Sequence, residues 1–169
     1  MGEHHQHEGK HTVHLALVAR LRAQAAEIAR LTSGLDESAL ARRTVPDKWS
    51  LKELVCHFRR MEAVFADRFK QMLTDDAIIV PYDDPDHDPV FIALTKRPTA
   101  EVLAEFFAER DALCRRLDSL TPAEWHRTAR HPQFAYYDLH FGVEYMVHHE
   151  AHHIYQLFQR RVPFGKMPH

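Results

Sequence analysis

Residues 50–72 read SLKELVCHFRRMEAVFADRFKQM, and their pattern decides the fold class. Ser50 followed three residues later by Glu53 forms a capping box, in which each side chain satisfies a free backbone N–H at a helix start. The apolar side chains that follow recur at helical spacing, at Leu51, Leu54, Val55, Phe58, Phe65 and Phe69. The stretch is therefore predicted to be a long helix with one apolar face, which other helices must cover.

Three further long helices are predicted around this one. Each shows apolar residues at helical spacing and is bounded by residues that start or stop helices, and the predicted spans are about 11–31, 98–117 and 138–161. Only short helical turns fit residues 36–40 and the surroundings of Trp125, and no stretch alternates like a strand. The sequence thus predicts an all-α protein, a four-helix bundle formed by a single domain over residues 11–169.

Two segments are predicted to lie outside the helices. Residues 1–10 are polar and rich in histidine, and we expect a disordered tail there. Residues 74–90 contain six aspartates and three prolines, a composition typical of a loop. This loop is either a solvated connection or the rim of a site. It is not an EF-hand, because the required glycine and the terminal glutamate are both missing.

The overall charge and hydropathy exclude several classes of protein. The 169 residues include 22 Lys and Arg against 24 Asp and Glu, a formal net charge of −2, so no basic stripe for nucleic acid is present. No apolar run approaches the roughly 18 residues of a membrane helix, and the N-terminus lacks the apolar segment of a secretory signal. Two cysteines, Cys56 and Cys114, do not make a disulfide framework. We therefore expect a cytoplasmic protein that binds neither nucleic acid nor membrane.

The sharpest chemical feature is the sequence HHEAHH at residues 148–153. Histidines four residues apart lie one turn apart on the same helix face, which lets both bind one metal ion. At about 100° per residue, His149 and His153 lie beside the apolar arc of the helix, whereas His148 and His152 face outward or sideways. The sequence therefore predicts that the pair His149 and His153 faces the bundle interior.

A tight metal site needs at least three protein donors, and His57 is the candidate for the third. A lone histidine on that apolar flank is also compatible with an ordinary core residue, but the inward pair favours a metal. Glu150 either accepts a ring N–H from a ligating histidine or forms a surface ion pair. Tyr145 and Gln156, on the same margin as the pair, either hydrogen-bond a metal-bound water or simply pack.

The residues His149-Glu150-x-x-His153 also satisfy the zincin pattern HExxH. A zincin needs a third ligand downstream and a substrate cleft between lobes. Only 16 residues follow His153, and they offer only weak donors and the terminal His169. We therefore reject the protease interpretation.

Two motifs carry a family resemblance. The segment Lys48–His57, KWSLKELVCH, is similar to the Trp-Ser…His stretch of the DinB/YfiT-like superfamily, and His149-x-x-x-His153-x-x-Gln156 resembles the closing helix of that family. The resemblance covers about residues 30–160 and implies a four-helix bundle in an up-down-down-up arrangement. It also implies a divalent metal, nickel or zinc, held by three histidines, which by position are His57, His149 and His153. Many members of the family dimerise, so a homodimer is expected.

The resemblance implies two kinds of activity. Some members are transferases or isomerases that use low-molecular-weight thiols, and others are metal-dependent hydrolases. An open metal site lowers the pKa of bound water or binds a thiol as thiolate. We therefore expect a metal-dependent transferase or hydrolase that acts on a small molecule, with a low-molecular-weight thiol as candidate cofactor and Glu150 and Tyr145 as candidate catalytic residues.

The alternative is a non-catalytic metal-binding or stress-related module, in which the metal pins two helices together. In either case we expect the loop at residues 74–90 and the loop containing His131-Pro132 to rim the mouth of the site. The loop at 74–90 is not part of the pattern shared by the family.

Overall fold

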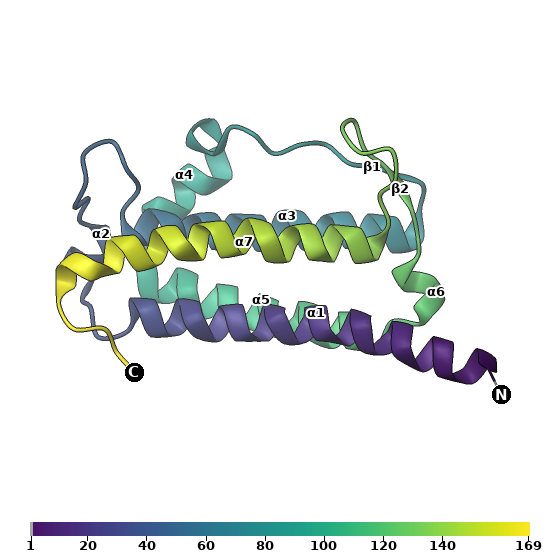
Figure 1. The fold of residues 1–169 in the computed structure, drawn as a ribbon. Coiled ribbons are helices and arrows are strands. Elements are labelled where there is room, and N and C mark those ends of the chain that lie inside the picture. Colours follow the sequence, from purple (N-terminus) through teal and green to yellow (C-terminus); the bar gives the residue numbers. More distant parts are fainter. Residues whose placement is uncertain (1) are drawn as a thin grey trace.

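Four long helices form a bundle in this computed structural model, which describes residues 2–169, with side chains described from residue 12 onward. They are α1 (Gly2–Thr32), α3 (Leu51–Thr74), α5 (Thr99–Asp118) and α7 (Leu139–Arg161). In Figure 1, α1 and α7 run in one direction along the bundle, while α3 and α5 run in the other. The order along the chain is therefore up-down-down-up, and the predicted fold class is confirmed.

The helix starts carry the capping residues that the sequence indicates. Ser50 and Glu53 exchange hydrogen bonds at the start of α3, and the side chain of Asp138 accepts a backbone N–H at the start of α7. The short helices α2 (Glu37–Ala41) and α6 (Pro122–Trp125) form where turns are predicted. A short 3-10 turn, η2 (Val162–Phe164), follows α7.

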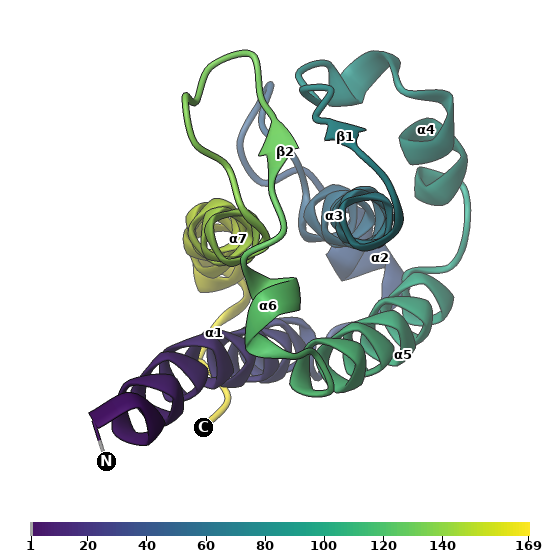
Figure 2. The same cartoon turned by 90° about the vertical axis from the view of Figure 1, so that its right-hand side faces the viewer.

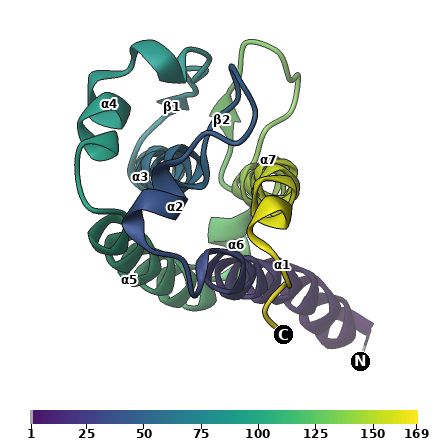
Figure 3. The same cartoon turned by 90° about the vertical axis from the view of Figure 1, so that its left-hand side faces the viewer.

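The connection from α3 to α5 is long because these consecutive helices run in the same direction. The chain must return along the length of α3, about 36 Å at 1.5 Å per residue, before α5 begins. Residues 75–98 make this return over α3, with α4 on the side of α3 away from α7 (Figures 1 and 3). The prediction that residues 74–90 contain no regular structure is wrong in part, since β1 (Ala77–Ile78) and η1 (Pro85–His87) form there and α4 (Pro89–Thr95) begins there. Both η1 and α4 place proline in the first turn, where its missing N–H is not needed.

The strand β1 pairs in parallel with β2 (Ala129–Arg130), which lies in the connection between α6 and α7. Ala77 lies opposite Ala129, and the N–H of Ile79 donates to the carbonyl of Arg130 at 2.8 Å. Figure 2 shows the two strands side by side above α3 and α7. Two residues are too few for strand alternation to be recognised in a sequence. The pairing joins the two long loops of the molecule into one rim.

A buried ion cluster connects all four long helices. Arg110 of α5 is 2% exposed and lies between Glu62 of α3 and Glu150 of α7, which are 1% and 7% exposed. Its Nη2 donates to Glu62 at 2.8 Å and also to Glu150, while its Nη1 donates to Glu150 at 2.8 Å and to the Leu21 carbonyl of α1 at 2.9 Å. Apolar clusters fill the rest of the interior. One guanidinium therefore fixes the relative positions of α1, α3, α5 and α7.

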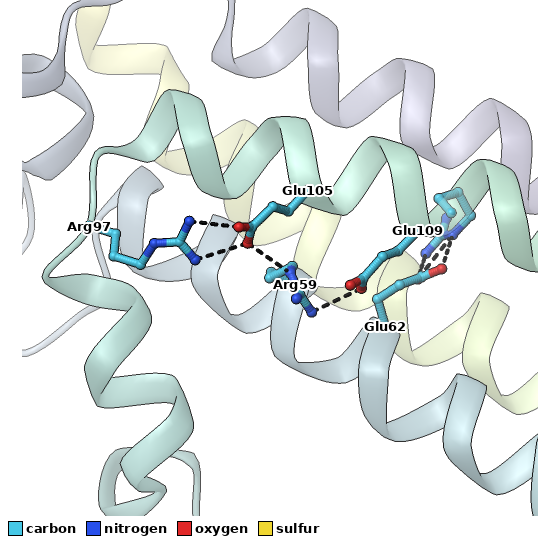
Figure 4. Close-up of polar contacts among 6 residues, drawn as sticks. Arg59, Glu62, Arg97, Glu105 and Glu109 are labelled. Carbon is cyan, nitrogen blue, oxygen red and sulfur yellow. Dashed lines mark hydrogen bonds and ion pairs between the residues drawn. The ribbon is translucent and has the colours of Figure 1, made fainter.

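Further charges pair on the outer side of α3 and α5 (Figure 4). Arg59 contacts Glu105 at 3.4 Å and Glu109 at 2.9 Å, and Arg97 contacts Glu105 at 2.6 Å. Pairs as exposed as these contribute about 0–1 kcal/mol each, because water competes for both charges. The buried cluster around Arg110 is therefore the charged group on which the stability of the bundle depends most.

The N-terminal helix begins earlier than the sequence predicts. The backbone of residues 2–10 continues α1, in place of the expected disordered tail, and the side chains of residues 2–11 lie outside the described part. No proline interrupts this segment, and extending an existing helix costs far less than starting a new one. Among the described helices, none is both long and apolar enough to cross a membrane.

Candidate metal centre

Three histidines converge where α3 contacts α7: His57 from α3, and His149 and His153 from α7. One ring nitrogen of each lies within 4.8 Å of those of the other two. The Nε2 atoms of His57 and His153 are 3.1 Å apart, and the ring centroids of His149 and His153 are 4.8 Å apart. Within residues whose side chains are described, no other group of three His, Cys, Asp or Glu is close enough to share an ion. The structure therefore brings together the three residues that the sequence singles out, and ion binding stays a prediction.

The other two histidines of the HHEAHH segment face outward, as the helical phase predicts. His148 is 63% exposed and lies 3.8 Å from Glu144, one turn earlier on α7. His152 is exposed as well, whereas His149 and His153 are only partly exposed. The pair His148 and His152 and the pair His149 and His153 have the same spacing in the sequence. They differ only in their position relative to the apolar face of α7, and this position decides which pair faces the interior.

Burial holds the three converging imidazoles in the neutral form. Burial, together with the neighbouring His153 and His149, lowers the pKa of His57 to about 3. Burial also lowers the pKa of His149 to about 4 and lowers the pKa of His153, although the hydrogen bond to Gln156 opposes the shift of His153. Neutral imidazole is the form that binds a metal ion. At neutral pH the site therefore has its donors ready and does not need to release protons first.

Gln156, and not Glu150, orients a histidine of the site. The Nδ1–H of His153 donates to Oε1 of Gln156 at 2.8 Å, which leaves the lone pair of Nε2 directed at His57. The prediction that Glu150 accepts a ring N–H from a ligating histidine is wrong, because its two oxygens accept from Arg110. A buried carboxylate needs a counter-charge more than an imidazole needs an acceptor. Gln156 thus has the orienting role predicted for Glu150.

Two aromatic side chains flank the histidines. The ring of Tyr145 lies nearly parallel to that of His149, with centroids 6.3 Å apart, and its exposed side reaches solvent. The ring centroid of Trp49 lies 5.0 Å from that of His57, and its Nε1–H donates to Asp86 at 3.3 Å. Trp49 therefore ties the aspartate-rich loop to the start of α3. The catalytic role expected for Tyr145 stays a prediction.

A cavity of about 190 Å³ opens beside His149. The two loops contribute Tyr82, Asp83 and His131 to its wall, and α3 contributes Arg68 among others. The expectation that the loops at 74–90 and around His131 rim the site is confirmed. Arg68 is not among the residues predicted from the sequence, although a signal exists: it follows His57 by eleven residues, three helical turns, and so lies on the same face of α3.

A family model supports the family membership that the sequence motifs suggest. The model of the DinB superfamily matches residues 20–157. The chain belongs to the DinB superfamily. The fold of this DinB-superfamily protein is similar to that of YfiT from Bacillus subtilis, described as a probable metal-dependent hydrolase with an unusual four-helix bundle topology. The TM-score is 0.75 at 20% identity over 89% of this chain and 86% of YfiT, so the likeness shows a shared fold. No curated protein matches the sequence.

The donor set of this DinB-superfamily protein fits a divalent ion. Two nitrogens bound to one tetrahedral zinc ion at about 2.0–2.1 Å lie about 3.3 Å apart, and the Nε2 atoms of His57 and His153 are separated by 3.1 Å. The Nδ1 of His57 is buried without a hydrogen-bond partner in the described residues. No carboxylate therefore competes with an ion for His57.

Proposed function

We propose that this protein is a divalent-metal-dependent enzyme that acts on a small molecule, with the ion held by His57, His149 and His153. One observation carries the proposal: three neutral imidazoles converge beside a cavity, and no carboxylate of the described residues joins them. Three protein donors leave coordination positions open, as in catalytic sites and unlike closed structural ones. A divalent ion in such a site lowers the pKa of a water or thiol that it binds, and nickel and zinc both suit imidazole donors.

Thiol S-transfer is the reaction that the geometry favours, because two separate hollows flank the histidines. His149 lines the cavity described above, and His153 lines a second hollow of about 240 Å³ together with Trp49 and Arg160. A transfer has two reactants, and two hollows let each approach the site by its own route. In the reaction, the thiolate sulfur forms a bond to an electrophilic carbon, and the leaving group departs with the electron pair of the bond that breaks.

The hydrogen bonds that Glu150 accepts also favour thiol transfer over hydrolysis. Because both of its oxygens accept hydrogen bonds from Arg110, Glu150 is not free to act as a general base. A thiol that binds as thiolate has already lost its proton and needs no such base. Hydrolysis is the second candidate, since YfiT is described as a probable hydrolase, and a purely structural ion between α3 and α7 is the third.

Cobalt substitution of the full-length chain tests the proposal. Histidines near the N-terminus can also bind metal, so the informative quantity is the difference between variants. His149→Ala should bind one ion fewer per chain than wild type, while the matched control His152→Ala, on the exposed face, should bind as many as wild type. Equal cobalt content in both variants would contradict the metal site.

Addition of cysteine or glutathione to the cobalt-loaded protein then separates the candidate reactions. Thiolate ligation should add a sulfur-to-metal charge-transfer band in the near ultraviolet, which His149→Ala should lack. If cobalt binds at the site but no cellular thiol produces this band, thiol transfer is refuted and hydrolysis or a structural ion is left.

A further inference from the structure

Arg68 is a charged group that the proposed metal chemistry does not use. It lies on α3, half-buried, with its guanidinium carbon 5.3 Å from the centroid of the Phe65 ring. Its Nη2 donates to the backbone carbonyl of Val80 at 2.6 Å, in the loop that covers the site. No carboxylate pairs with it among the described residues. Burial without a counter-charge is costly for a guanidinium, and here burial lowers the pKa of Arg68.

The wall around Arg68 is built to receive an anion. Tyr137 and Tyr145 line the same cavity, and burial raises the pKa of Tyr137 to about 12, so its phenol stays a neutral hydrogen-bond donor. His131 lines the same cavity, and the positive charge of Arg68 contributes, after burial, to lowering the pKa of His131. The single acidic residue of the described wall, Asp83, is exposed at the edge.

The cavity that Arg68 shares with His149 suits a small ligand. Phe65 neighbours both groups, since its ring centroid lies 5.3 Å from the guanidinium carbon of Arg68 and 6.0 Å from the centroid of the His149 ring. The cavity of about 190 Å³ is slightly larger than the cavities of about 150 Å³ that hold one benzene ring. A molecule the size of one substituted ring therefore fits in the cavity that Arg68 and His149 both line.

We infer that Arg68 binds the carboxylate or phosphate group of a small organic anion whose other end lies beside His149. The planar fork of a guanidinium matches the two oxygens of such a group, and Arg68 has donors left after its bond to Val80. A cationic ligand would be repelled, and a neutral ligand would leave the guanidinium without a counter-charge. That this anion is the substrate of an enzyme rests on the proposed function. The binding of the anion by Arg68 does not.

The test measures binding of benzoate, phenyl phosphate and neutral benzamide to the full-length protein by calorimetry, both after chelation and with zinc added. Wild type should bind at least one of the two anions, and bind it more tightly than benzamide. Arg68→Gln should weaken binding of that anion about tenfold or more, because a charge-assisted hydrogen bond is lost. The matched control Arg115→Gln, an exposed arginine of α5, should bind as wild type does. Which anion binds more tightly decides between a carboxylate and a phosphate.

Several results would overturn the inference. It fails if neither anion binds in either form, if benzamide binds as tightly as the anions, or if Arg68→Gln keeps wild-type affinity. Should Arg68→Gln not fold, Arg68→Lys replaces it: lysine keeps the charge but lacks the fork, so a severalfold loss is expected and unchanged affinity refutes the role of Arg68. Since the chelated protein is measured separately, failure to bind metal would refute the proposed function and leave the anion result standing.

Discussion

Replacement of Arg110 by methionine should destabilise the protein strongly. In the folded protein this guanidinium is the counter-charge of both Glu62 and Glu150, and all three side chains are almost completely buried. Methionine is shorter than arginine but apolar and of similar volume, so Arg110→Met removes the charge and the hydrogen bonds while it leaves little empty space. Two buried carboxyl groups then face each other without a cation.

The expected loss is about 3–5 kcal/mol of the free energy of unfolding, the range measured when one partner of a buried ion pair is removed. At the size of this chain, where 1 kcal/mol shifts the melting temperature by about 2–4 °C, that corresponds to a fall of about 6–20 °C. The loss should be smaller at pH 5 than at pH 8. Without Arg110 the folded protein raises the pKa of the carboxyl groups, binds more protons than the unfolded chain, and so gains relative stability as the pH falls.

Urea unfolding of the metal-free protein, followed by circular dichroism, measures the effect. A second variant with Glu62→Leu, Arg110→Met and Glu150→Leu together should be far more stable than Arg110→Met alone, because it leaves no buried charge. The reasoning is refuted if Arg110→Met loses less than about 1 kcal/mol, or if the triple variant is as unstable as the single one. Arg110→Lys, which keeps the charge, should lie between wild type and Arg110→Met.

Four further predictions concern the site and its surroundings. Equilibrium dialysis should find one nickel or zinc ion fewer per chain in His149→Ala than in His152→Ala, and equal amounts would contradict the helical phase argument. The pKa values of His57 and His149, lowered to about 3 and 4, mean that the unfolded chain takes up protons below about pH 6.5 while the folded one does not. The urea midpoint of the metal-free protein should therefore fall from pH 7 to pH 4, and a constant midpoint would show that these groups titrate normally. Gly142→Ala places a methyl group 2.8 Å from the Tyr137 hydroxyl, so crowding should outweigh the helix-propensity gain of about 1 kcal/mol, and a stabilised variant in the same assay would exclude this close contact. Chelation should lower the melting temperature and leave the helical circular dichroism at 25 °C intact, because the apolar core suffices without the ion; complete unfolding would be the contrary result.

The bundle was largely predictable because helix starts and apolar faces are local properties. The cap at Ser50 and the cap at Asp138 each depend on residues within one turn, and both are present in the structure. The direction of the helices is not local, and the resemblance to the DinB family supplied it. The return loop at 74–90 was recognised as irregular by its prolines and aspartates, but its pairing with β2 depends on a segment far along the chain.

Those features of the site that depend on one helix were predictable. Those that depend on contacts between two elements were not. The 3.6-residue period places His149 and His153 on the inner side of α7 without knowledge of any other element. The partner of Glu150 is Arg110, forty residues earlier on α5, and nothing in HHEAHH indicates which helix covers that side. From the sequence alone, Arg68 likewise looks like a solvated surface residue, because its contact with Val80 depends on how the loop folds.

Helices carry the histidines and loops carry much of the cavity wall, and this difference affects how such proteins diverge in sequence. The three histidines lie on α3 and α7, whose packing the core fixes, whereas much of the neighbouring cavity wall comes from two loops joined at β1 and β2. Loops accept substitutions that cores do not, so the shape of the cavity can change in a lineage while the three histidines persist. Because the parallel pair holds the two loops in one register, an insertion in either loop moves the wall built by the other. New specificities are therefore expected to arise through paired changes on both sides of this short sheet.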